Sequence, residues 1–297
     1  MHLQEVTMRS FPGCAVLLFL LLASGTAALA EGPTTAPSPR DPAEVAAVLA
    51  KAPKMSGQSQ PIHVIIIAGP KDHGPGEHDY PAFQKSWPSL LGKSPNTKVS
   101  TAWEWPTPEQ WEGVDVAVCY LRTKWSKEQI DDIKKLQSRG GGVVLVHWAI
   151  APDQGGLWDE HRALVGLNWK RLKYRHGPLD LKLTQPNNPI TLGLPSTIHV
   201  IDEAYWPMEG DMSKITLLAT SDERTIDTEP AAPMPMFWTY QPAHGGRAFV
   251  CILGHYMWTF DDPYFRLMLM RGIAWSANKD VYRFDALATD PMKTLEK

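Results

Sequence analysis

The sequence predicts an α/β fold in which a single doubly wound, mostly parallel sheet carries helices on both faces. Residues 63–68 form a continuous β-branched run ending at a Gly-Pro pair, which is typical of a strand buried on both faces. Strand-like residues 114–121 and 143–146 flank a capped amphipathic helix, which is the order of a right-handed parallel crossover. The β-rich run 248–253 then leads into a helix that is apolar nearly all round.

The first third of the chain alternates strands and helices. The run 63–68 is the first predicted strand, and Pro81 to Leu91 predicts a helix. A second strand is expected over 98–102, and residues 114–121 form the next buried strand. This alternation favours a parallel sheet with helical crossovers.

A capping box marks the next helix. Ser126 is followed three residues later by Gln129, and apolar residues then recur on one helical face until Gly140 ends the helix. Two more glycines lead into the short apolar strand 143–146. That strand stops at His147, so this imidazole is expected at the carboxyl edge of the sheet.

The second half of the chain is less regular. A helix is expected around 159–165 and a strand over 179–183. Regular sequence patterns reappear near the end of the chain, where they predict a strand over 248–253 and a helix over 263–277. Asp262 supplies the N-cap of this helix.

The first thirty residues resemble a signal peptide. Arg9 precedes an uncharged apolar run, and Ala28 and Ala30 are small residues of the kind found at a signal peptidase site. We expect cleavage after Ala30, export to the periplasm or the medium, and no membrane attachment of the mature chain. The expected layout is a signal peptide over 1–30, a Pro/Ala-rich linker over 31–60, an α/β domain over 61–280 and a C-terminal tail over 281–297.

Charge and cysteine usage narrow the class of ligand. The net charge of -3 and the pI near 6.4 provide no basic face for phosphate backbones, so we expect no nucleic-acid partner. Cys119 and Cys251 each lie inside an apolar strand-like run, which favours buried free thiols over a disulfide.

Twelve tryptophans are many for this length. They fit either aromatic platforms for sugar rings or ordinary packing.

Four histidines fall at one predicted edge of the sheet. His73 and His78 lie in the loop after the first strand, His147 ends the middle strand, and His255 follows the late strand. Ligands of open parallel sheets bind outside the carboxyl ends of the strands. A single histidine at a strand end is more often a hydrogen-bonded structural residue. It is their number at one edge that predicts a functional cluster.

The loop 72–79 has the composition of a cation site. It interleaves two imidazoles and three carboxylates with residues that permit sharp turns. We therefore place His73, His78 and His147 as candidate ligands of a divalent ion, zinc or manganese. The alternative is acid/base chemistry without a metal, in which Glu77 or Asp72 sets the tautomer of a catalytic histidine.

Residues further along the chain are candidates for the same cleft. His176 and Glu203 are expected to line it, together with Tyr205. For Glu203, a surface carboxylate is the competing interpretation. Trp148 and Trp238 are the tryptophans that we place among the substrate contacts, and His161 is expected to be a solvated helical residue.

With these residues in view, the chain resembles the ThuA-like (trehalose utilisation) family from about residue 61 to 278. That family has an architecture like the class I glutamine amidotransferases and the flavodoxin-like proteins. The segments that carry the resemblance are 71–78, 146–149, 188–190 with 193–195, 202–205, Trp238 ahead of 245–247, 254–255, 265–266 and 272–275.

Two departures limit what the resemblance implies. After His78 the family often continues with a further acidic residue, a histidine or aromatic, and Ala-Gly, whereas this chain has Asp-Tyr-Pro-Ala-Phe. Where an amidotransferase has its nucleophilic cysteine, the strand ends in His147 and Trp148. Thioester glutaminase chemistry is therefore excluded by the lack of a thiol at this turn.

The resemblance implies an enzyme of carbohydrate catabolism that acts on a disaccharide, a glycoside or a keto-sugar, and the signal-like leader adds that this enzyme is exported. His73, Glu77, His147 and His255 are the candidate catalytic residues, and the reaction is hydrolysis, elimination or isomerisation assisted by a metal or a histidine. A sugar oxidoreductase of the same pathway is the expected protein partner, and no nucleotide cofactor is expected. The alternative hypotheses are a non-catalytic saccharide-binding module and a scaffold on a degenerate amidotransferase-like fold.

Overall fold

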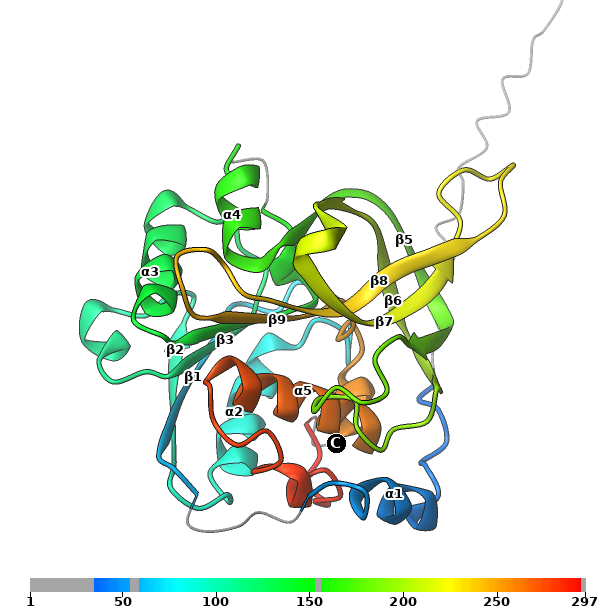
Figure 1. The fold of residues 1–297 in the computed structure, drawn as a ribbon, viewed down its shortest axis with the longest axis horizontal. Coiled ribbons are helices and arrows are strands. Elements are labelled where there is room, and N and C mark those ends of the chain that lie inside the picture. Colours follow the sequence, from blue (N-terminus) through cyan, green and yellow to red (C-terminus); the bar gives the residue numbers. More distant parts are fainter. Residues whose placement is uncertain (1–34, 54–58, 153–155, 295–297) are drawn as a thin grey trace, which may run out of the picture. The chain divides into compact units, whose positions relative to one another are not determined.

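The computed structural model describes residues 35–53, 59–152 and 156–294 (Figure 1). Residues Pro33–Lys297 form one compact unit. The expected signal peptide and its cleavage point after Ala30 lie outside the described residues. None of the described helices is long and apolar enough to cross a bilayer.

In the described part of the chain, nine strands form one sheet in the order β2-β1-β3-β4-β9-β8-β7-β5-β6. Its first five strands are parallel to one another. The order 2-1-3-4 followed by one more parallel strand is that of flavodoxin-like sheets. The bounds of these strands are β2 (Thr97–Trp103), β1 (Ile62–Ala68), β3 (Val116–Tyr120), β4 (Gly142–Val146) and β9 (Arg247–Cys251).

The other half of the sheet is antiparallel, so the prediction of a mostly parallel sheet is wrong. Its longest strands, β5 and β6, have 17 and 14 residues and pair along most of their length, which makes the whole sheet mixed and mostly antiparallel. The short connection 224–231 joins β7 to its antiparallel neighbour β8, whereas parallel pairing would need a long crossover. The strands are β5 (Leu167–Leu183), β6 (Thr197–Gly210), β7 (Ile215–Glu223) and β8 (Ala232–Tyr240).

Helices cover both faces of the parallel half, as predicted. Figure 1 shows α3 (Lys127–Ser138) and α4 (Trp158–Val165) on one face, and α2 (Tyr80–Leu91) and α5 (Pro263–Ser276) on the other. Nearly all of α5 is buried, which agrees with its apolar sequence. Short 3-10 helices occupy Pro108–Trp111, His147–Ile150, Met212–Lys214, Met257–Asp261 and Asp285–Leu287.

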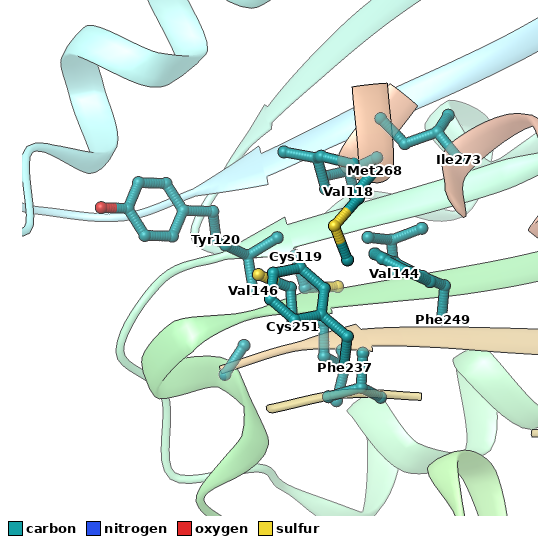
Figure 2. Close-up of a cluster of buried hydrophobic side chains, with 14 of the residues drawn as sticks. Val118, Cys119, Tyr120, Val144, Val146, Phe237, Phe249, Cys251, Met268 and Ile273 are labelled. Carbon is teal, nitrogen blue, oxygen red and sulfur yellow. The ribbon is translucent and has the colours of Figure 1, made fainter. Parts of the chain in front are cut away.

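Figure 2 shows the core between the parallel strands and α5. Val118 of β3 and Val144 of β4 lie under Met268 of α5. Cys119 and Cys251 are buried free thiols, as predicted. Burial raises the pKa of both thiols, so they stay protonated and inert.

Both terminal segments contain packed structure. Helix α1 (Pro42–Leu49) lies within the expected linker, and its Val45 and Val48 are buried. In the expected tail, Arg283 and Phe284 are buried, and the Arg283 guanidinium donates to the carbonyl of Gln60. The folded unit thus extends beyond the predicted domain 61–280 on both sides.

Candidate functional site

The four strand-end histidines meet at the carboxyl edge of the parallel strands. The His78 ring lies at the centre of the group, and its centroid is 3.9 Å from that of His73, 4.8 Å from that of His147 and 4.5 Å from that of His255. Strands β4 and β9, which precede His147 and His255, are neighbours, and β3 alone separates β4 from β1. The convergence expected from the sequence is therefore present in the structure.

The β5–β6 pair closes the site from the antiparallel side. His176 of β5 lies directly opposite Glu203 of β6, and Tyr174 lies opposite Tyr205. Opposed residues share one face of a sheet, as do residues two apart on a strand. These four side chains therefore share the face on which Glu203 meets His147.

Two of the clustered histidines have a left-handed backbone. His78 has φ 41° and His147 has φ 56°, a region that non-glycine residues rarely adopt. The backbone of His78 is held in place because its N–H donates to the carbonyl of His255. Strain of this kind is concentrated at functional sites, where the surrounding structure overcomes its cost.

Four buried side chains offer ligand atoms to a common point. Nε2 of His78 lies 2.8 Å from Nε2 of His147 and 3.0 Å from Nδ1 of His255. Oε2 of Glu203 lies 3.2 Å from Nε2 of His147 and 3.0 Å from Nδ1 of His255. The four atoms all lie within 4.8 Å of one another, so this group could hold a metal ion. We call these four residues the metal cluster.

Hydrogen bonds outside the metal cluster fix two ring tautomers. Nδ1 of His147 lies 2.7 Å from the carbonyl oxygen of Ile252, and Nδ1 of His78 lies 2.8 Å from Oδ1 of Asp72. Both partners accept, so each Nδ1 donates a hydrogen bond and the Nε2 of each ring is directed into the metal cluster. Metal-binding histidines are oriented in this way by a carbonyl or a carboxylate behind the ring.

The two acids around the metal cluster are held as anions. Burial by itself would raise the pKa of Glu203, but hydrogen bonds from His147 and His255 outweigh it and lower the pKa below the usual range. Burial opposes ionisation of Asp72 as well, and hydrogen bonds from His73 and His78 again lower its pKa. Burial lowers the pKa of His78 to about 3, so its ring is neutral. Neutral imidazole beside carboxylate is a donor set for divalent cations.

Asp202 fastens the turn that carries His255. Its carboxylate accepts hydrogen bonds from the backbone N–H groups of Glu203, Gly254 and His255. The side chain is fully buried, and burial raises its pKa. Asp202 thus ties β6 to the end of β9 and sets the positions of two members of the metal cluster.

The rim of the site carries groups that can exchange protons with solvent. His73 is partly exposed, and its hydrogen bond to Asp72 raises its pKa. His176 is also partly exposed, and burial of the rest of its ring lowers its pKa. Glu77 lies 3.9 Å from Nε2 of His255, and the Tyr256 hydroxyl lies 3.1 Å from Nδ1 of His176.

Aromatic side chains build the wall behind His147. The Tyr205 hydroxyl lies 2.7 Å from Nε2 of His147, and its ring stacks on Trp169 at 3.9 Å. Trp148 is almost fully buried, and the Arg122 guanidinium lies over its ring at 4.6 Å. Tyr205 and Trp148 therefore lie at the site, where the sequence placed them, but mainly as its wall.

Several site residues differ from the sequence-based assignment. Trp238 lies in β8, is fully buried and donates to the carbonyl of Val165, so it is a core residue and its expected substrate contact is wrong. His73 is outside the metal cluster and belongs to a second, more exposed group with Asp72 and His78. His255 and Glu203 take its place beside His78 and His147.

The sequence did not single out three residues that contribute to the site. Asp202 precedes Glu203 directly, but its three backbone partners depend on the loop after β9. Arg122, which pairs with Asp72 at 3.3 Å, lies in no motif. Tyr174 is 51% exposed, and its ring centroid lies 5.9 Å from that of His176. The signal in the sequence was its position two residues before His176, which places both side chains on one face of a strand.

Comparisons with known proteins identify a family and solved structures with a similar fold. A family model described as ThuA, trehalose utilisation, matches residues 64–276. A protein described as ThuA-like from Parabacteroides merdae ATCC 43184 has 21% identity and a TM-score of 0.53, covering 73% of this chain and 90% of its own. Another from Bacteroides uniformis ATCC 8492 has 16% identity and a TM-score of 0.56, covering 75% and 94%. No curated protein matches the chain.

Proposed function

Because this chain belongs to the ThuA family, which is described as trehalose utilisation, we propose that it is an enzyme of carbohydrate catabolism acting on a disaccharide, a glycoside or a keto-sugar with the help of a divalent ion. The family supports the class of substrate. The metal cluster supports the use of an ion, and the groups at the rim support proton transfer.

The observation that carries the proposal is the convergence of His78, His147, His255 and Glu203. In a tetrahedral zinc site with Zn–N distances of about 2.0–2.1 Å, neighbouring ligand atoms are separated by about 3.3 Å. Four separations within the metal cluster are 2.8–3.2 Å and all of its ligand atoms lie within 4.8 Å of one another, so side-chain shifts would bring them to that spacing. Zinc or manganese fits a set of neutral imidazoles with one carboxylate.

The residues at the rim have the geometry of acid/base partners. A bound ion supplies a Lewis acid that polarises a carbonyl or hydroxyl oxygen of the sugar. His73 is oriented by Asp72 and lies at the open side of the metal cluster, where it reaches a substrate hydroxyl. Glu77 faces His255 from the loop after β1 and is the second proton carrier. Hydrolysis, elimination and isomerisation all use this combination.

One observation favours a second function, a saccharide-binding module without catalysis. Tyr174 presents an exposed aromatic ring beside His176, as sugar-binding platforms do. Calorimetry separates the two functions. An intact disaccharide that binds and yields no product after long incubation with zinc or manganese favours the module.

The signal-like leader supports a proposal on location, and the family supports one on the pathway. We propose that the chain is exported to the periplasm or secreted after cleavage behind Ala30, and that a sugar oxidoreductase works in the same pathway. N-terminal sequencing of the protein recovered from its native compartment tests the first part. A mature chain that starts at Met1 contradicts it.

The enzymatic proposal is tested by a substrate panel. Disaccharides and their oxidised derivatives are incubated with the wild-type protein, with and without zinc or manganese. We expect turnover of at least one compound that depends on the ion. If no compound on the panel is converted, or if conversion is indifferent to chelation, the metal-assisted enzyme is refuted.

A further inference from the structure

A cleft lies beside the metal cluster at the point where the strand order reverses. Strand β1 pairs with β2 on one side and with β3 on the other, and the cleft lies outside the carboxyl ends of these three strands. It has a volume of about 570 Å³, within the range of small-molecule sites. Open α/β sheets bind ligands at such a switch point. Its lining includes Gly69, Pro70, Glu104, Arg122, Lys124 and Gln129.

Arg122 connects this cleft to the metal cluster. Its Nη1 lies 3.3 Å from Oδ2 of Asp72, whose other oxygen accepts the hydrogen bond from His78. The same guanidinium lies over Trp148, the residue after His147. Arg122 and Asp72 therefore lie between a ligand in the cleft and His78 of the metal cluster.

The lining fits a neutral polyhydroxy ring. Arg122 and Lys124 provide donors, Glu104 provides a carboxylate acceptor, and Gln129 adds an amide. The opposite charges of this set do not select a strongly charged ligand. Sugar hydroxyls, which both donate and accept, satisfy such a mixture.

We propose that the switch-point cleft is a second sugar subsite, which holds the distal ring of a disaccharide while the proximal ring lies over the metal cluster. This inference rests on the proposed function for the identity of the substrate, but it concerns residues outside the metal cluster. It explains why Arg122 spans the two sites, and it implies selectivity for a disaccharide over a monosaccharide.

The test compares trehalose with glucose by calorimetry on the metal-loaded protein. A Cβ at Gly69 would lie 3.6 Å from Cβ of Leu121, an ordinary contact, so Gly69→Val can fill the cleft without backbone strain. We expect Gly69→Val to weaken trehalose binding about tenfold or more, which is about 1.4 kcal/mol, and to change glucose binding by less than about twofold. Lys124→Ala, the second variant, should weaken trehalose alone by about threefold.

Lys134→Ala is the matched control, because this lysine of α3 borders a different surface hollow. Metal content, measured in every variant, reports whether the metal cluster stays intact. The subsite is refuted if Gly69→Val and Lys124→Ala bind trehalose like the wild type, or lose trehalose and glucose equally. That result leaves the metal-assisted enzyme standing. If selective loss occurs while His147→Ala turns over normally, the subsite stands and the metal-assisted enzyme fails.

Discussion

The Nε2 atoms of His78 and His147 lie 2.8 Å apart, and the Nδ1 atom of each ring already donates a hydrogen bond on its other side. Two rings held in this way direct both Nε2 atoms at a common point. A divalent cation bound there would take both nitrogens as ligands. The acceptors behind the rings, Asp72 and the Ile252 carbonyl, therefore determine what the metal cluster can bind.

Asp72→Asn should weaken metal binding while leaving the fold intact. The amide can still accept from Nδ1 of His78, but the negative charge that makes this ring a better ligand is lost. Outer-shell changes of this kind cost about 10–100-fold in metal affinity. Competition with a chelator measures the loss. Asp131→Asn is the control, since Asp131 is exposed on α3 and pairs with Lys127. Equal metal affinity in the two variants would show that Asp72 does not support metal binding.

Tyr174→Ala should raise KM for a saccharide substrate and leave kcat and metal content near the wild-type values. Its ring is exposed beside His176, and an aromatic contact adds about 0.5–1.5 kcal/mol, or roughly two- to twelvefold in affinity. Tyr174→Phe keeps the ring and should retain the wild-type KM. Met212→Ala, at another exposed apolar residue, is the control. A KM unchanged by Tyr174→Ala would exclude the ring from substrate binding.

His161 should make the protein less stable in acid. The expectation of a solvated residue was wrong, because His161 is fully buried against Trp125, and burial lowers its pKa to about 3. The unfolded chain takes up the proton near pH 6.5. Stability is therefore complete above about pH 6.5 and falls toward pH 3, by about 1.4 kcal/mol per pH unit.

Urea unfolding at pH 6.5 and pH 4.5 measures this contribution. Replacement by an uncharged ring, His161→Phe, should reduce the loss of stability between the two pH values by roughly 2–3 kcal/mol. His199→Phe is the control, because His199 is largely exposed and pairs with Asp180. The assignment fails if the His161 and His199 variants lose stability over this interval as steeply as the wild type.

The parallel half of the sheet could be predicted because each of its central strands is buried on both faces and therefore has a continuous apolar sequence. β1, β3 and β4 are buried along their whole length, and their apolar runs stand out in the sequence. The antiparallel half could not be predicted in the same way. β5 contains Gly177-Pro178, which resembles a turn, and its pairing with β6 shifts register between Trp169 and Lys173. Such features interrupt the simple alternation that identifies a strand.

The candidate site was predicted to the extent that it depends on strand ends. His78, His147 and His255 follow parallel strands, so their meeting follows from the topology. The place of Glu203 depends on the register of β5 and β6, which only the folded hairpin sets. Trp238 was expected at the site but lies in the core. A tryptophan in a buried strand has no local sequence signal that distinguishes it from one facing a ligand.

Metal analysis of the purified protein tests the central claim most directly. After removal of loosely bound ions, wild-type protein and the control His199→Ala should each carry about one divalent ion per chain. His147→Ala and Glu203→Gln should retain less than about a tenth of it and lose turnover in parallel. A wild-type protein without stoichiometric metal, or a His147→Ala variant that keeps its ion and its turnover, would contradict the account.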